Sequence, residues 1–64
     1  MNNKALMMML YTHNKAAGEI IIQSVLANKA KLSDLKDIRA NLSNALAAVV
    51  ELERRCIHEQ NETK

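Results

Sequence analysis

Apolar residues recur with helical periodicity over residues 4–28. At about 100° per residue, they form one continuous arc that covers more than half of the circumference of a helix. A helix that packs against a single neighbour needs an apolar stripe only somewhat wider than about 100°. The pattern therefore predicts a helix with more apolar surface than one neighbour can cover. The arc consists of Leu6, Met7, Met9, Leu10, Ala17, Ile20, Ile21, Ile22 and Val25.

A second apolar repeat, with alternating spacings of three and four residues, runs through residues 33–59. This heptad pattern is typical of a helix that packs along its length against other helices. Leu46, Val50 and Ile57 widen the seam along one flank, which again favours two neighbours rather than one. The seam itself consists of Leu35, Ile38, Leu42, Ala45, Val49, Leu52 and Cys56.

Polar residues of the second helix are predicted to lie away from this seam. Glu51 and Arg55 are four residues apart in the order that favours an ion pair on a helix, which contributes roughly 0.2–0.5 kcal/mol. The residues expected away from the seam are Asn41, Asn44, Glu51, Arg55 and Glu59.

A short segment between the two repeats interrupts both patterns. Asn28 suits the left-handed conformation that ends many helices. Ser33 is a suitable N-cap for the second helix, with Asp34 and Asp37 in the first turn, where the helix dipole favours acidic residues. A connection this short makes the two helices antiparallel neighbours.

The expected fold is therefore all-α, a single antiparallel two-helix hairpin spanning residues 1–64. We expect one helix over about 4–28, a turn over 29–32 and a second helix over about 33–59. The polar residues 60–64 are expected to fray.

Sixty-four residues are few for a self-sufficient core. Ordering costs roughly 1.5 kcal/mol per residue, and one helix–helix interface cannot bury the roughly 4,000 Å² of apolar surface that would offset it. Because Cys56 is the only cysteine, an internal disulfide is excluded, and association is the remaining source of stability. We expect self-association into a four-helix-bundle-like dimer. The first helix would contribute Leu6, Leu10, Ala17 and Ile21 to the seam of this dimer.

Two charged residues at the border of the seam could determine how two copies of the chain pair. Arg39 and Glu53 are placed to set the register of an interface through charge pairing, or else are solvated flanking residues. The net charge of +2 is small, and no apolar run approaches the 18 residues of a membrane span. The absence of a membrane-length apolar run and the single cysteine favour a soluble, cytoplasmic protein.

Candidate chemistry is sparse. His13 lies inside the apolar arc, where an imidazole is more often a hydrogen-bonded interface residue than a metal ligand or pH switch. Cys56 continues the seam and is interpreted as a small core residue. Cys56 and His58 point in different directions on a helix, and a zinc site needs about four convergent ligands. We expect no metal, no cofactor and no enzymatic activity.

A basic cluster surrounds the turn, diluted by Asp34 and Asp37. Phosphate binding draws its affinity from the number of charges neutralised, so weak or no nucleic-acid binding is expected. A nucleic-acid-binding regulator that uses this cluster remains the alternative function. The cluster consists of Lys29, Lys31, Lys36 and Arg39.

The opening residues Met1-Asn2-Asn3-Lys4-Ala5-Leu6-Met7-Met8-Met9-Leu10-Tyr11-Thr12, with the chain length and helical pattern, define a further resemblance. The chain resembles small proteins of lambdoid bacteriophages, encoded by short open reading frames between the exonuclease and excisionase genes. The resemblance implies an accessory protein in the bacterial host cytoplasm that influences the choice between lytic growth and lysogeny through a host or phage protein partner. It implies no catalytic residue.

Overall fold

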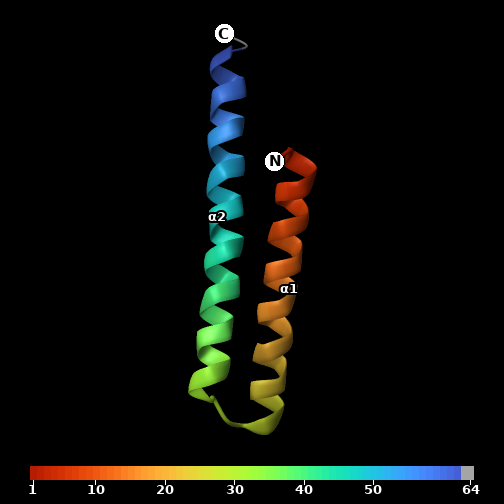
Figure 1. Ribbon diagram of the computed structural model, residues 1–64, viewed down its shortest axis with the longest axis vertical. Helices are drawn as coiled ribbons and strands as arrows, with labels where there is room; N and C mark the ends of the chain where they lie inside the picture. The colour runs from red at the N-terminus through yellow and green to blue at the C-terminus, as the bar shows by residue number, and fades with distance from the viewer. Residues whose placement is uncertain (63–64) are drawn as a thin grey trace.

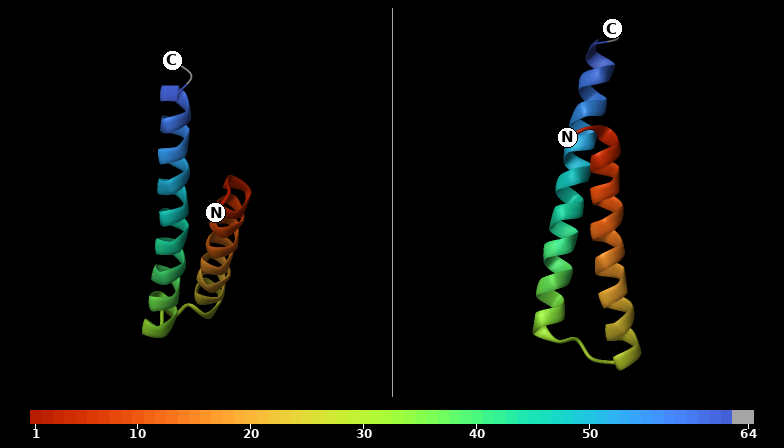
Figure 2. Two further views of the ribbon diagram at one scale, coloured as in Figure 1. Left: turned by 45° about the horizontal axis from the view of Figure 1, so that its top comes forward. Right: turned by 45° about the vertical axis from the view of Figure 1, so that its right-hand side comes forward.

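Two α-helices make up nearly all of residues 1–62, the part of the chain that the computed structural model describes (Figure 1). α1 spans Asn3–Ala27 and α2 spans Leu32–Glu62, and the two run antiparallel, side by side. Figure 2 shows the pairing from two further directions, with α2 extending beyond the N-terminus of α1. No strand occurs among these residues. The predicted all-helical hairpin is confirmed, with overall dimensions of 52 × 16 × 16 Å.

Asparagine residues close both ends of α1. The side-chain Oδ1 of Asn2 accepts a hydrogen bond from the backbone N–H of Ala5 at 2.7 Å, which satisfies a donor that the helix itself leaves unpaired. Asn28 adopts the left-handed conformation, with φ 51° and ψ 41°, and its N–H donates to the carbonyl of Val25. The predicted end of the first helix at Asn28 is confirmed. The Asn2 cap was not anticipated.

The ends of α2 differ from those predicted. The helix begins at Leu32, and the N–H of Leu35 donates to the carbonyl of Lys31 at 3.0 Å, so Ser33 lies inside the first turn instead of capping it. At the other end, α2 continues through residues 60–62, past the predicted end near residue 59. The rest of the predicted tail, residues 63–64, lies outside the described residues.

The surface of α2 that packs on α1 is rotated relative to the predicted seam. Leu42 and Cys56 are exposed, whereas the residues that precede them, Asn41 and Arg55, are half-buried. The prediction that Asn41 and Arg55 lie away from the helix interface was therefore wrong. The contact stripe of α2 includes Ile38, Asn41, Ala45, Ala48, Leu52 and Arg55, again with alternating spacings of three and four residues.

The core between the helices is thin. Leu6, Ala17, Ala45 and Ala48 are the buried apolar residues of the described chain, and three of them are alanine. Small residues allow the helix axes to approach closely, since interaxial distance depends on the side chains at the contact. α2 thus contacts α1 through buried alanines and half-buried side chains, Ile38 and Leu52 among them, and its exposed large apolar side chains lie on an adjoining flank.

Gly18 has no contact within the hairpin that requires glycine. A Cβ atom built at this position meets no atom within 4 Å, and its backbone is helical with negative φ. Close approach of α2 therefore does not account for Gly18, although glycine in a helix interior costs about 1 kcal/mol relative to alanine.

Candidate interaction surface

Large apolar side chains from both helices remain exposed on one side of the hairpin. At about 100° per residue, Ile21 and Val25 lie on one flank of the contact surface of α1, and five residues of α2 lie on the corresponding flank of that helix. Because both helices are right-handed and run antiparallel, the two flanks face the same side. Met7, five helical turns before Val25, lies on the same stripe of α1. We call this surface the apolar face; it consists of Met7, Ile21, Val25, Leu35, Leu42, Leu46, Val50 and Ile57.

Two shallow grooves run between the helices along this side. The first, near the open end of the hairpin, is lined by Leu10, Val49, Leu52, Glu53, Cys56 and Ile57. The second, near the turn, is lined by Ile21, Ser24, Val25, Asn28, Lys29, Ala30, Leu35 and Ile38. Both grooves contain side chains of both helices, so the apolar face continues across the hairpin from α1 to α2.

The exposed area of the hairpin is larger than that of a compact monomer of the same mass. Its accessible surface is 5206 Å², whereas a compact monomer of 7.2 kDa exposes about 4,100 Å². The excess, about 1,100 Å², exceeds the roughly 800 Å² that each partner buries in a standard protein–protein interface. The elongated shape and the exposed apolar side chains both contribute, since Leu46 is 62% exposed and Val50 54%.

The predicted dimer and core seam is divided between the hairpin interior and this outer surface. Its buried members are Leu6, Ala17 and Ala45. Its half-buried members are Leu10, Ile38, Val49 and Leu52. Its exposed members are Ile21, Leu35, Leu42 and Cys56. The exposed members all belong to the apolar face or line its grooves, so the seam continues from the interior onto that face.

Two opposite charges lie in line with the apolar face of α2. Arg39 and Glu53 are seven residues before and seven residues after Leu46, which places all three on one stripe of the helix. Both charged side chains are exposed, and neither forms an ion pair with another described residue. Glu53 lines the first groove, so its carboxylate borders apolar surface.

A polar pair connects the helices inside the contact stripe. His13 Nδ1 and Asn41 Oδ1 are 3.0 Å apart, and both side chains are half-buried. Asn41 Nδ2 donates to the carbonyl of Asp37 at 2.9 Å, which leaves Oδ1 as the acceptor. The proton between the two residues therefore lies on His13 Nδ1. The interpretation of His13 as a hydrogen-bonded interface residue is confirmed.

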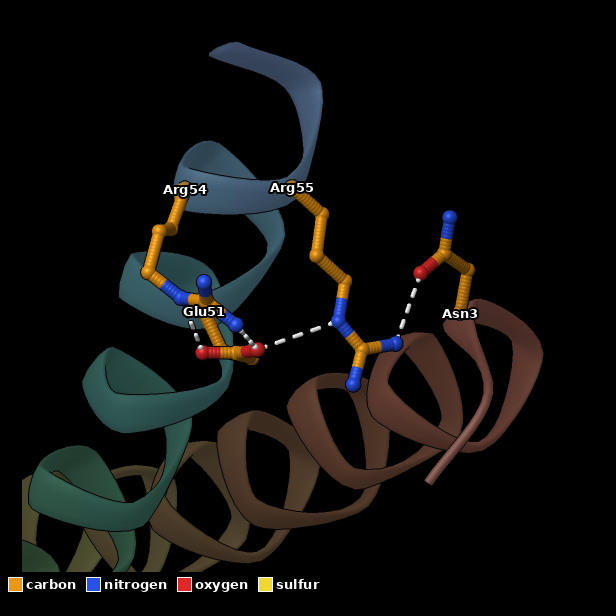
Figure 3. Close-up of polar contacts among 4 residues, drawn as sticks. All are labelled: Asn3, Glu51, Arg54 and Arg55. Atoms are coloured by element: carbon orange, nitrogen blue, oxygen red, sulfur yellow. Dashed lines mark hydrogen bonds and ion pairs between the residues drawn. The ribbon is translucent and has the colours of Figure 1, made fainter. Parts of the chain in front are cut away.

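A cluster of charged and polar residues connects α1 to α2 at the open end of the hairpin (Figure 3). Arg54 and Arg55 both donate to the carboxylate of Glu51, and the Nε of Arg55 lies 3.1 Å from Oε1. The predicted Glu51–Arg55 pair is confirmed. Arg55 Nη1 also donates to Oδ1 of Asn3 at 2.9 Å, so the cluster reaches from α2 to α1.

The guanidinium of Arg54, and after it that of Arg55, lowers the pKa of Glu51 to about 2 from an ordinary value of 4.5. Hydrogen bonding to Glu51 in turn raises the pKa of Arg54. Since these charged groups remain accessible to water, their coupling is screened. The cluster is a surface contact that links the two helices.

Substitution of Glu51 by Gln should remove part of the stability that the folded state loses at low pH. A carboxyl whose pKa is lower in the folded state stabilises that state above its ordinary pKa and loses this contribution as the pH falls. We expect the wild type to be more stable than Glu51→Gln above about pH 4.5, and the difference to shrink as the pH falls from 4.5 and to vanish below about pH 2. Urea unfolding of both proteins across this range measures the difference. A difference that stays constant with pH would contradict the assignment.

The basic cluster lies at the turn end of the hairpin. Lys29 and Lys31 belong to the connection, Lys36 and Arg39 lie on α2, and all four are exposed. Asp34 and Asp37 share the same end of α2, so the cluster is interrupted by acidic side chains as the sequence predicted. Lys29 also lines the second groove, where its charge borders the apolar face.

Among the residues whose side chains the structure describes, no three His, Cys, Asp or Glu form a group that could hold a metal ion. Neither α1 nor α2, over its described length, combines the length and hydropathy needed to cross a membrane. Cys56 is exposed in the single hairpin, where it lines the first groove.

Comparison of the chain with protein-family models, with curated proteins and with solved structures gave no match.

Proposed function

We propose that the protein is a non-enzymatic helical adaptor that works as a homodimer and acts through contacts with another protein. The observation that carries the proposal is the apolar face, an exposed surface that joins both helices and accompanies an excess area of about 1,100 Å². Contiguous apolar surface of this kind marks interaction sites. Two copies that cover each other's apolar faces form a four-helix bundle.

The biological setting in this proposal rests on the resemblance of residues 1–12 to small early-region proteins of lambdoid bacteriophages. In that setting the dimer is an accessory regulator in the host cytoplasm. It influences the choice between lytic growth and lysogeny by binding a host or phage protein. Dimerisation buries the apolar faces, so the outer polar surfaces, including the basic cluster and the flank around Lys15 and Glu19, are left for that partner.

Sedimentation equilibrium tests self-association. We expect a mass of about twice the 7.2 kDa of the chain at micromolar concentration, because one hairpin does not cover its own apolar face. Circular dichroism on the same samples reports whether the chain is helical. A helical species of 7.2 kDa would overturn the dimer, and a mass well above two chains would replace it with a stacked assembly.

A further inference from the structure

The order of charges and apolar residues along α2 carries information about how a second copy docks. This inference rests on the proposed dimer and specifies its geometry. A symmetric dimer that covers the apolar face has a two-fold axis lying in the interface. If the axis runs across the hairpin, α2 packs antiparallel on α2 of the second copy. If the axis runs along the hairpin, α2 packs on α1 of the second copy, and both turns lie at the same end.

The sequence of α2 is nearly self-complementary about Leu46 when it is paired with an antiparallel copy. Positions four residues before and after Leu46 are Leu42 and Val50, and positions eleven before and after are Leu35 and Ile57. In such a pair each exposed apolar side chain of α2 on the apolar face meets an apolar side chain of the other copy. Leu46 meets its own equivalent at the centre.

The charges obey the same symmetry. Arg39 and Glu53 lie seven residues on either side of Leu46, so an antiparallel α2 pair places Arg39 of each copy opposite Glu53 of the other. Charge pairs at the edge of a helical interface set its orientation and register. Neither residue has an ion-pair partner within the described part of its own hairpin, so both are available for these contacts.

The alternative arrangement leaves Arg39 without an acidic partner. With both turns at one end, Arg39 faces the middle of α1 of the second copy, near Gly18 and Ile21, because the His13–Asn41 contact sets which parts of the two helices lie level, and no acidic residue lies on this flank of α1. Glu19, the only acidic residue of α1, lies on a different flank, with Thr12 and Lys15. A charge placed against apolar surface loses hydration without compensation.

We infer that two copies of this chain dock head to tail, with the turn of each beside the open end of the other and two Arg39–Glu53 pairs across the interface. The apolar faces supply the buried area, and the charge pairs select this arrangement over the one with both turns together. The bundle then presents one basic turn at each of its two ends.

Cys56, the only cysteine, is a built-in reporter of the arrangement. It lies ten residues from Leu46, so head-to-tail docking separates the two Cys56 residues by about 30 Å along the bundle. With both turns together the two residues are level, and the diagonal of a four-helix bundle separates them by only about 14 Å. Pulsed electron paramagnetic resonance on the full chain, spin-labelled at Cys56, measures this distance.

We expect a distance distribution centred near 30 Å. A dimer with a distance below about 20 Å would overturn head-to-tail docking and leave the proposed dimer standing. If the labelled protein gives no dipolar signal, and the labelled and unlabelled proteins are both monomeric by sedimentation, head-to-tail docking and the proposed dimer are both overturned. If only the labelled protein is monomeric, charge reversal, which needs no label, decides between the arrangements.

Charge reversal tests the pairs themselves. Arg39→Glu and Glu53→Arg each create two like-charge contacts in the head-to-tail dimer, and each should weaken dimerisation by on the order of ten-fold, since two attractions are replaced by two repulsions. The double variant restores both pairs and should recover most of the wild-type affinity. Lys36→Glu, an equal change of charge outside the apolar face, is the control and should have little effect. Additive losses in the double variant would overturn the inference.

Discussion

Replacing Leu42 by Asp should convert the proposed dimer into separate hairpins, raising the dissociation constant by at least a hundred-fold. Leu42 is 45% exposed in the hairpin and lies near the centre of the apolar face, so the hairpin tolerates the change better than the dimer does. Burial of an unpaired carboxylate costs several kcal/mol, and a symmetric dimer buries two of them. Sedimentation equilibrium gives the dissociation constant, and circular dichroism follows the helices.

Asn44→Asp is the matched control for Leu42→Asp. Asn44 is exposed on α2 outside the apolar face, so the same acidic side chain should leave dimerisation nearly unchanged. The two substitutions change the net charge equally and lie two residues apart on one helix. Equal effects of the two would show that the apolar face has been assigned to the wrong flank of α2.

Replacing Ala48 by Leu should destabilise the hairpin itself. Ala48 is 2% exposed between α1 and α2, and a larger side chain there forces the two helices apart. Overpacking of this kind typically costs about 1–3 kcal/mol, a large fraction of the stability available to so small a chain. Urea unfolding at a fixed protein concentration measures the loss, because the proposed dimerisation would make the midpoint concentration-dependent.

Ala47→Leu provides the comparison for Ala48→Leu. Ala47 is the adjacent residue of α2 and is exposed, and leucine is nearly as favourable as alanine in a helix. Ala47→Leu should change the free energy of unfolding by no more than about 0.5 kcal/mol, as for most surface substitutions. A larger loss at Ala47 than at Ala48 would mean that α2 turns another side toward α1.

The helices and the turn were predictable because each depends on local signals. Apolar periodicity located both helices, and Asn28 between two disrupted patterns located the end of the first. The rotation of the α2 contact stripe was not predicted. Periodicity finds the apolar surface of a helix, but it does not assign parts of that surface to different neighbours. Ala48 carries little signal of its own, and an asparagine such as Asn41 has no apolar character to mark it as an interface residue.

The Asn2 cap had a sequence signal that the hydrophobic pattern does not use. Asparagine is among the preferred N-cap residues, and Asn2 directly precedes a strong helix-forming segment. The apolar face was predicted in part, since Leu46, Val50 and Ile57 indicated a second neighbour. Its continuity with Ile21 and Val25 depends on which side of the hairpin each flank occupies. That relation is fixed by the antiparallel packing and not by either helix alone.

The antiparallel arrangement of α1 and α2 also determines how the molecule behaves when it is tethered. The beginning of α1 and the end of α2 lie at the same end of the hairpin (Figure 1). A fluorescent protein fused to either terminus therefore sits far from the turn, along a molecule 52 Å long. Immobilisation on a sensor through either terminus presents Lys29 and Lys31 outward. In a head-to-tail dimer the two fusions lie at opposite ends, so the bundle acts as a rigid spacer between them.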